Sequence, residues 1–184
     1  LAYLPSPGMV RLRLTTSGTD ENVLRKNVEE KISELQKLIP QHIYGYEKDK
    51  LEEIVGTLLR EKKQTLSLAE SCSGGLIAHM ITSVPGSSEY FMGSVVSYSY
   101  ESKTNLLGVT KEMLENFGAV SEEVVTQMAL GAIKRFNTDW AIAASGIAGP
   151  GGGMEGKPVG TVWIAVAGAN GVKAKKFQFG GDRE

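Results

Sequence analysis

Cysteine and histidine are scarce in this sequence, and their scarcity excludes several kinds of site. The 184 residues include one cysteine, Cys72, and two histidines, His42 and His79. A lone thiol cannot form a disulfide within the chain and has no partner at the spacing of a zinc site. His42 precedes the main domain and His79 lies within an apolar helical pattern, so a Ser-His-Asp triad is not expected.

A strong net charge and a long apolar run are also missing. The 20 lysines and arginines nearly balance the 21 acidic residues, and their dispersal argues against a dedicated nucleic-acid-binding surface. No stretch has the length of a membrane span or the layout of a signal peptide. We therefore expect a cytoplasmic protein with no membrane or nucleic-acid partner. With 41% hydrophobic residues, the chain can bury one core and carry a smaller second unit.

Residues 1–45 predict a small, partial α+β unit. Residues 10–18 alternate apolar and polar side chains, as a half-buried strand does. Thr19 or Asp20 can cap a helix that Pro40 ends, and residues 42–46 predict a second short strand. Two strands and one helix bury little apolar surface by themselves.

Residues 46–184 predict the main domain, an α/β fold of three α/β/α layers around a mixed, mostly parallel sheet. Strands expected at 65–69, 92–99 and 140–145 alternate with helical patterns, which is typical of a parallel sheet. Two later apolar runs flank an Asn-Gly turn at Asn170 and predict an antiparallel hairpin.

Ligands in open α/β sheets bind beyond the carboxyl ends of the parallel strands, so the loops there carry the candidate chemistry. In the first loop, ESCSGG at 70–75, glycines at a helix start would let backbone N–H groups approach an anion. Its serines could equally be plain helix caps. Cys72 in this loop fits a packed thiol better than a nucleophile, because the sequence offers it no base.

The second candidate stretch runs from the turn SVPGSSEYF, residues 83–91, to SYSYESK, which ends at Lys103. A serine needs a base to become a nucleophile, and a lysine of lowered pKa can be that base. Tyr98 could relay a proton or donate to an oxyanion. From spacing alone, however, a solvated lysine and a core aromatic ring are the favoured interpretation.

The third loop, residues 145–160, has four glycines between positions 149 and 153. A stretch so poor in side chains, directly after a buried strand, favours a backbone cradle for a ligand. It contains neither a Walker A motif nor the glycine fingerprint of dinucleotide-binding folds.

Taken together, the three loops resemble the CinA C-terminal domain family. The stretches LAESCSGG, SVPGSSEYF, SYSYESK, GAVSEEVV and AIAASGIAGPGGGMEGKPVG are similar to that family in order, over residues 47–184. The resemblance implies a nicotinamide mononucleotide (NMN) deamidase, a hydrolase of the pyridine nucleotide cycle that recycles NAD. It implies no metal, no cofactor and a homodimer. Residues 1–45 are similar to the end of a KH-like linker domain, which joins this module to a molybdopterin-binding-like domain in full-length proteins.

The same resemblance implies a set of site residues. Ser88 is the implied nucleophile, Lys103 the general base and Tyr98 its neighbour, while Ser71 assists and is the alternative nucleophile. The implied substrate-binding residues are Glu70, Ser73, Gly74, Gly75, Ser145, Gly146, Gly149, Pro150 and Arg183. Ser73 and Ser145 stand where the family commonly has threonine, and the hydroxyl group is kept.

The implied reaction is acyl transfer, in which serine attacks the carboxamide carbon and backbone N–H groups stabilise the oxyanion. Two other classes of function are open. A non-catalytic nucleotide-binding or regulatory module of a competence/damage-inducible protein could use the same glycine-rich loops. A nucleic-acid adaptor is suggested by the KH-like segment, although no G-x-x-G loop is present there.

Overall fold

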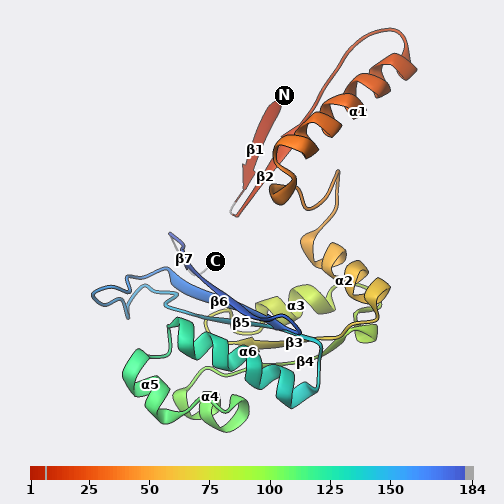
Figure 1. Cartoon of the computed structure of the whole chain (residues 1–184). Helices are drawn as coiled ribbons and strands as arrows, with labels where there is room; N and C mark the ends of the chain where they lie inside the picture. Colours follow the sequence, from red (N-terminus) through yellow and green to blue (C-terminus); the bar gives the residue numbers. More distant parts are fainter. Residues whose placement is uncertain (7, 181–184) are drawn as a thin grey trace. The chain divides into compact units, whose positions relative to one another are not determined.

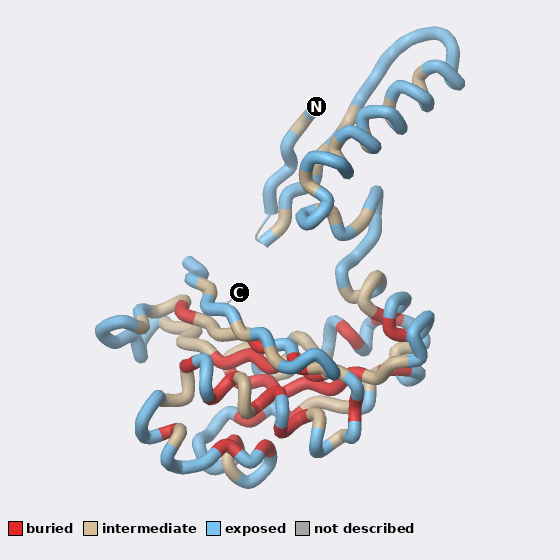
Figure 2. The backbone as a smooth tube through the Cα atoms, viewed as in Figure 1, coloured by how far each residue is buried: buried red, intermediate tan, exposed pale blue. Residues whose placement is uncertain are grey.

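The computed structural model describes residues 1–6 and 8–180, which fall into two units, one ending at Lys48 and the other beginning at Asp49. The N-terminal unit contains β1 (Ala2–Ser6), β2 (Met9–Arg13), α1 (Glu21–Leu38) and a 3-10 turn, η1 (Pro40–His42). The side chain of Asp20 caps α1, as predicted, by accepting hydrogen bonds from the backbone N–H groups of Asn22 and Val23. None of the described residues of this unit is buried (Figure 2).

The second strand expected in this unit is in the wrong place. Residues 42–46 form no strand; instead β1 pairs antiparallel with β2, from Ala2 opposite Arg13 to Ser6 opposite Met9. Pro40 sets its own φ and begins the 3-10 turn, so the chain after α1 continues as a turn.

The larger unit is the predicted α/β domain with a mixed sheet. Its elements are α2 (Leu51–Lys62), β3 (Leu66–Glu70), α3 (Leu76–Thr82), η2 (Ser87–Glu89), β4 (Phe91–Val96), α4 (Tyr100–Leu107), α5 (Lys111–Phe117), α6 (Glu122–Phe136), β5 (Trp140–Gly146), β6 (Thr161–Gly168) and β7 (Gly171–Gln178). The strand order is β4-β3-β5-β6-β7. Strand β3 runs parallel to β4 and β5, whereas β6 and β7 add an antiparallel hairpin.

Helices cover both faces of this sheet and make three layers (Figure 1). On one face, α6 packs its buried residues Val124, Val125, Met128, Ala129 and Ala132 against Ala141, Ala143, Ala165 and Ala167 of the strands. The other face holds a smaller core of Leu59, Leu66, Leu68, Ile81 and Tyr90, to which α2 and α3 contribute. The small alanine side chains let α6 lie close to the sheet.

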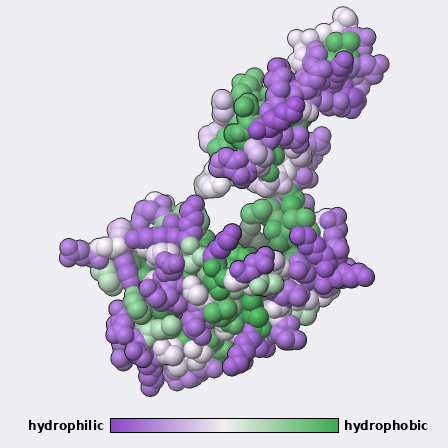
Figure 3. All heavy atoms as spheres, in the orientation of Figure 1, coloured by the Kyte–Doolittle hydropathy of each residue, from purple (hydrophilic) through white to green (hydrophobic). Residues whose placement is uncertain are grey.

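Hydrophobic side chains also reach the surface of the larger unit, and Figure 3 shows some of them as green patches among hydrophilic residues. Its exposed hydrophobic residues include Leu51, Leu58, Leu76, Met80 and Val166. Among the described helices, none combines the length and apolar character that a membrane span requires.

Candidate active site

Ser71 directly follows the carboxyl end of β3, which is an interior strand of the sheet. Its backbone N–H donates to Ala144 O of β5 at 3.0 Å, which extends the parallel pairing one residue beyond the strand. The residue is only 8% exposed. The next strand along the chain, β4, ends at the same edge because it runs parallel to β3, so residues that follow β4 can reach Ser71.

Lys103 is the residue that reaches it. Ser99 and Ser102 form a capping box that starts α4, and this places Lys103 on the inner side of the first turn, 1% exposed. Lys103 Nζ donates to Ser71 Oγ at 3.0 Å, to Ser97 O at 2.6 Å and to Tyr98 O at 3.4 Å. All three acceptors are uncharged oxygens.

The Lys103 amino group therefore lies in a buried position without an anionic hydrogen-bond partner among the described residues. Burial lowers its pKa, since removal from water disfavours the charged form, and only the nearby Cys72 thiol opposes this shift. A lysine of lowered pKa beside a serine hydroxyl is the arrangement that a serine nucleophile needs in the absence of histidine.

Glu70 is fully buried, and its carboxylate is occupied by the protein itself. It accepts hydrogen bonds from the backbone N–H groups of Gly75 and Ile77 at 3.0 and 3.1 Å, and from Ala78 N–H at 2.8 Å. The prediction of an anion site at this helix start is therefore wrong. The backbone amides of Gly75, Ile77 and Ala78, which would hold an external anion, already donate to Glu70. Gly74 N–H donates to Ser71 O at 3.2 Å.

Cys72 and Ser73 complete the turn after Ser71. The Cys72 sulfur packs against the backbone of Gly146, where an added Cβ would stand 3.0 Å from it. Burial is the main cause that raises the pKa of the Cys72 thiol. Ser73 Oγ is buried and has no hydrogen-bond partner among the described residues.

Ser88 lies away from this pair, although it is the serine expected to attack. It belongs to η2, which precedes β4, whereas Lys103 follows β4. The six residues of β4 separate the two positions by about 20 Å of strand. The fold therefore pairs Lys103 with Ser71, the alternative nucleophile. Tyr98 contributes its carbonyl oxygen to Lys103, and its side chain is 66% exposed.

Ser145 is the last residue but one of β5 and lies at the same edge of the sheet, but its hydroxyl group already has a partner. It is 1% exposed and donates to Ala119 O at 2.7 Å, which fixes the segment between α5 and α6. The following loop is anchored by its own backbone: Ile147 N–H donates to Thr161 O, and Gly160 N–H to Ile147 O.

The other predicted substrate-binding residues differ in their surroundings. Gly149 has a positive φ of 82°, and a Cβ there would stand 2.5 Å from a methyl group of Val159, while Pro150 is exposed. Arg183 lies outside the described residues. Sequence reasoning missed Ser97, and no sequence signal could have revealed it, because only its backbone carbonyl contacts Lys103.

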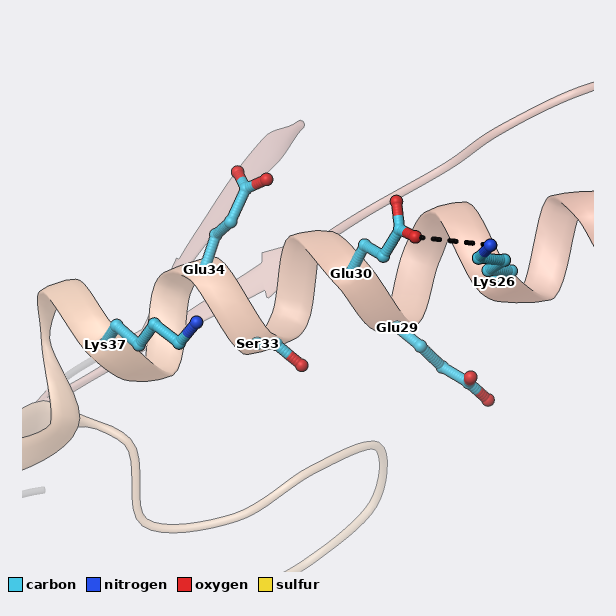
Figure 4. Close-up of a pocket in the computed structure, with 6 residues that line it drawn as sticks. All are labelled: Lys26, Glu29, Glu30, Ser33, Glu34 and Lys37. Carbon is cyan, nitrogen blue, oxygen red and sulfur yellow. Dashed lines mark ion pairs between the residues drawn. The ribbon is translucent and has the colours of Figure 1, made fainter.

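Two pockets lie elsewhere on the surface. One, of about 390 Å³ on α1, is lined by Lys26, Glu29, Glu30, Ser33, Glu34 and Lys37 (Figure 4). It is the exposed face of a single helix with ion pairs between successive turns. The other, of about 360 Å³, is lined by Asn116, Phe117, Val120, Ser121, Glu122, Glu123, Gly156, Lys157, Trp163 and Lys176. Neither includes Ser71 or Lys103.

Comparisons with known proteins agree with this architecture. A family model described as the CinA C-terminal domain matches residues 48–184, and the chain belongs to this family. It is 51% identical to a CinA-like protein of Flavobacterium psychrophilum and 47% identical to one of Cytophaga hutchinsonii. Each match covers 100% of the chain and 44% of the relative, so the chain spans less than half the length of these relatives.

Solved structures of the family share the fold. The competence/damage inducible protein of Agrobacterium tumefaciens has a TM-score of 0.69 and 42% sequence identity over 71% of this chain and 79% of that chain. A competence-damaged protein (CinA) superfamily protein of Escherichia coli has a TM-score of 0.71 and 31% identity over 79% of this chain and 87% of that chain. The larger unit therefore shares both its family and its fold with these solved structures.

Proposed function

We propose that the chain is a serine amidohydrolase that converts NMN to nicotinic acid mononucleotide and ammonia, with Ser71 as nucleophile and Lys103 as general base. The observation that carries the proposal is the 3.0 Å contact between Lys103 Nζ and Ser71 Oγ, made by a buried lysine. The choice of NMN rests on the resemblance to the CinA C-terminal domain family. The lowered pKa of Lys103 supports its role, because a general base must be neutral when it accepts the proton.

In the first half of the reaction, neutral Lys103 accepts the hydroxyl proton of Ser71 while Oγ bonds to the carboxamide carbon. The backbone N–H groups of Cys72 and Ser73 directly follow the nucleophile and are the donors that we propose for the oxyanion. Lys103 then returns the proton to the leaving nitrogen, and ammonia departs. An ester between Ser71 and the nicotinoyl carbonyl group remains.

In the second half, water attacks this ester while Lys103 accepts a proton from it, and the proton then returns to Ser71 as the acid leaves. The pyridinium charge of NMN would make its amide more electrophilic than a simple amide. We propose that loop 145–160 contacts the ribose and phosphate and that Arg183 binds the phosphate with its planar fork. We also propose that Tyr98 acts beside Lys103. The proposal further includes a homodimer, a cytoplasmic location and an upstream molybdopterin-binding-like domain in the full-length protein.

The test is ammonia release from NMN by the wild-type protein and by Ser71→Ala, Lys103→Met and Ser88→Ala, each shown to be folded by circular dichroism. We expect kcat to fall about 10²- to 10⁴-fold without the base and to be abolished without Ser71, while Ser88→Ala stays active. Loss of activity in Ser88→Ala with an active Ser71→Ala would move the nucleophile to Ser88. Binding of NMN without ammonia release would favour a non-catalytic nucleotide-binding module instead.

A further inference from the structure

We infer that Glu70 is a positioning residue that holds the turn of Ser71 in place, rather than a substrate ligand; this inference rests on the proposed function of Ser71. Glu70 is the last residue of β3 and the direct neighbour of Ser71. It is completely buried, so its carboxylate cannot meet a ligand from solvent in this conformation.

The side chain of Glu70 bridges the two ends of the turn. Its carboxylate receives three backbone hydrogen bonds, at 2.8 to 3.1 Å, from Gly75, Ile77 and Ala78, on the far side of residues 71–74. Hydrogen bonds to a carboxylate are shorter and stronger than those between neutral groups. The start of α3 is thereby tied to the end of β3, and the nucleophile lies between the two tied points.

The backbone of Glu70 reaches the other member of the pair. Ser97 N–H donates to Glu70 O at 2.8 Å, and Ser97 O in turn accepts from Lys103 Nζ at 2.6 Å. Glu70 is therefore connected to both groups. It reaches Ser71 through the turn of residues 71–74, which its carboxylate holds in place, and it reaches Lys103 Nζ through Ser97. A clamp of this kind sets the distance between nucleophile and base, to which the rate of proton transfer is sensitive.

The arrangement also explains why a buried acidic residue is tolerated here. A carboxylate out of water is costly unless hydrogen bonds satisfy it. Three backbone amides at a helix start provide such bonds, and Ser94 Oγ donates a longer one to Glu70 Oε1 at 3.5 Å. Glutamine has the same size but would turn an amide N–H₂ group toward these N–H donors, whereas aspartate keeps the charge on a shorter side chain.

The test compares Glu70→Gln with Glu70→Asp and with Glu112→Gln, the same change at an exposed first-turn position of α5. Three readouts apply: amide hydrogen exchange at Gly75, Ile77 and Ala78, the kcat and KM for NMN, and the rate at which a fluorophosphonate probe labels Ser71, read by mass spectrometry. The labelling rate reports the reactivity of Ser71 without requiring NMN to be the substrate.

For Glu70→Gln we expect faster exchange at the three amides, a kcat and a labelling rate lower by about 100-fold, and an unchanged KM. Glu70→Asp should recover part of both rates, and Glu112→Gln should match the wild type. A raised KM with unchanged kcat would overturn the inference in favour of a substrate ligand. Faster exchange with unchanged kcat and labelling would also overturn it.

The outcome can be separated from that of the proposed function. If the wild type is labelled at Ser71 but releases no ammonia from NMN, the proposed function fails while the labelling rates of the Glu70 variants still decide this inference. If folded wild-type protein is neither labelled nor active, both fail.

Discussion

The Lys103 amino group and the Ser71 hydroxyl oxygen are separated by 32 positions in the sequence and by 3.0 Å in the structure. Two parallel strands create this contact: Ser71 follows β3, and Lys103 follows β4 by one capped helical turn. The Lys103 amino group is thereby held away from water beside the Ser71 hydroxyl group, and its burial has consequences for both activity and stability that can be measured.

The activity should depend on pH through Lys103. Burial lowers the pKa of its amino group, and only the neutral amine can accept the Ser71 proton. We therefore expect kcat/KM to rise with pH along a limb that lies below the ordinary lysine value of about 10.4. The measurement is kcat/KM for NMN between pH 6 and 10. Tyr98→Phe is the control, because it removes another ionisable side chain near the site. The rise of kcat/KM with pH should be present in this variant as well, and its absence would assign the rise to Tyr98.

The lowered pKa of Lys103 should also make the stability of the fold depend on pH. A lysine whose pKa is lower in the folded state binds fewer protons there than in the unfolded state. The free energy of unfolding therefore rises with pH between the lowered pKa of Lys103 and about 10.4, with a slope of at most about 1.4 kcal/mol per pH unit.

Lys103→Met lacks this group, so its stability should rise less steeply over that pH range. Urea unfolding of both proteins at several pH values gives the two slopes, and the absolute stability of the variant is not needed for the comparison. Parallel curves for the two proteins would show that the pKa of Lys103 is the same in the folded and unfolded states.

The site could be predicted from the sequence only in part. The rule that functional loops follow parallel strands favours Ser71 and Lys103, which follow β3 and β4, over Ser88, which precedes β4. Strand order was needed as well, because only the pairing of β3 with β4 makes the two loops neighbours. The contacts of Glu70 could not be predicted from the sequence, since its partners are backbone amides placed by the fold.

The fold itself was easier to predict, because it depends on hydrophobic periodicity over long stretches. The alternation of strands and helices in the larger unit led to the three-layer domain, and the mixed sheet is confirmed. The error lies in the N-terminal unit, where residues 42–46 look like a strand but β1 is the partner of β2. Short apolar stretches with few buried contacts do not reveal their pairing, and Pro5 within β1 weakened its strand pattern.

Gly131 should be intolerant of any side chain, because α6 crosses α4 there at very short distance. A Cβ on Gly131 would stand 2.0 Å from the carbonyl oxygen of Leu107. We expect Gly131→Ala to lower the free energy of unfolding by about 1–3 kcal/mol, despite a gain of about 1 kcal/mol in helix propensity. Activity should fall too, because Leu107 belongs to the helix that carries Lys103.

Gly151→Ala is the matched control for Gly131→Ala. Nothing lies within 4 Å of a Cβ at Gly151, and its φ is not positive. Its stability should therefore stay close to that of the wild type. Urea unfolding of both variants measures the packing effect, ammonia release is measured for Gly131→Ala, and equal stability of the two variants would show that α4 can move away from α6 without cost.

Asp139 and Thr65 hold together the starts of the two strands that lead to Ser71 and Ser145. Asp139 Oδ2 accepts hydrogen bonds from Thr65 N–H at 2.7 Å and from Thr65 Oγ1 at 2.8 Å, while Asp139 N–H donates to Thr65 Oγ1 at 3.1 Å. The backbone N–H of Thr65 is the main cause that lowers the pKa of the Asp139 carboxyl group.

Replacing Asp139 by asparagine should therefore reduce stability by about 1 kcal/mol or less, because the carboxylate is exposed to solvent. A carboxyl group with a lowered pKa stabilises the fold above its unfolded pKa of about 3.9, and this contribution is lost as the pH falls through the folded value. The difference in unfolding free energy between wild type and Asp139→Asn should thus be present at pH 7 and shrink below pH 4. In a Thr65→Ser background, which keeps the hydroxyl group, Asp139→Asn should cause the same loss of stability at pH 7. An effect of Asp139→Asn that grew as the pH fell would show that the pKa of Asp139 is not lowered by folding.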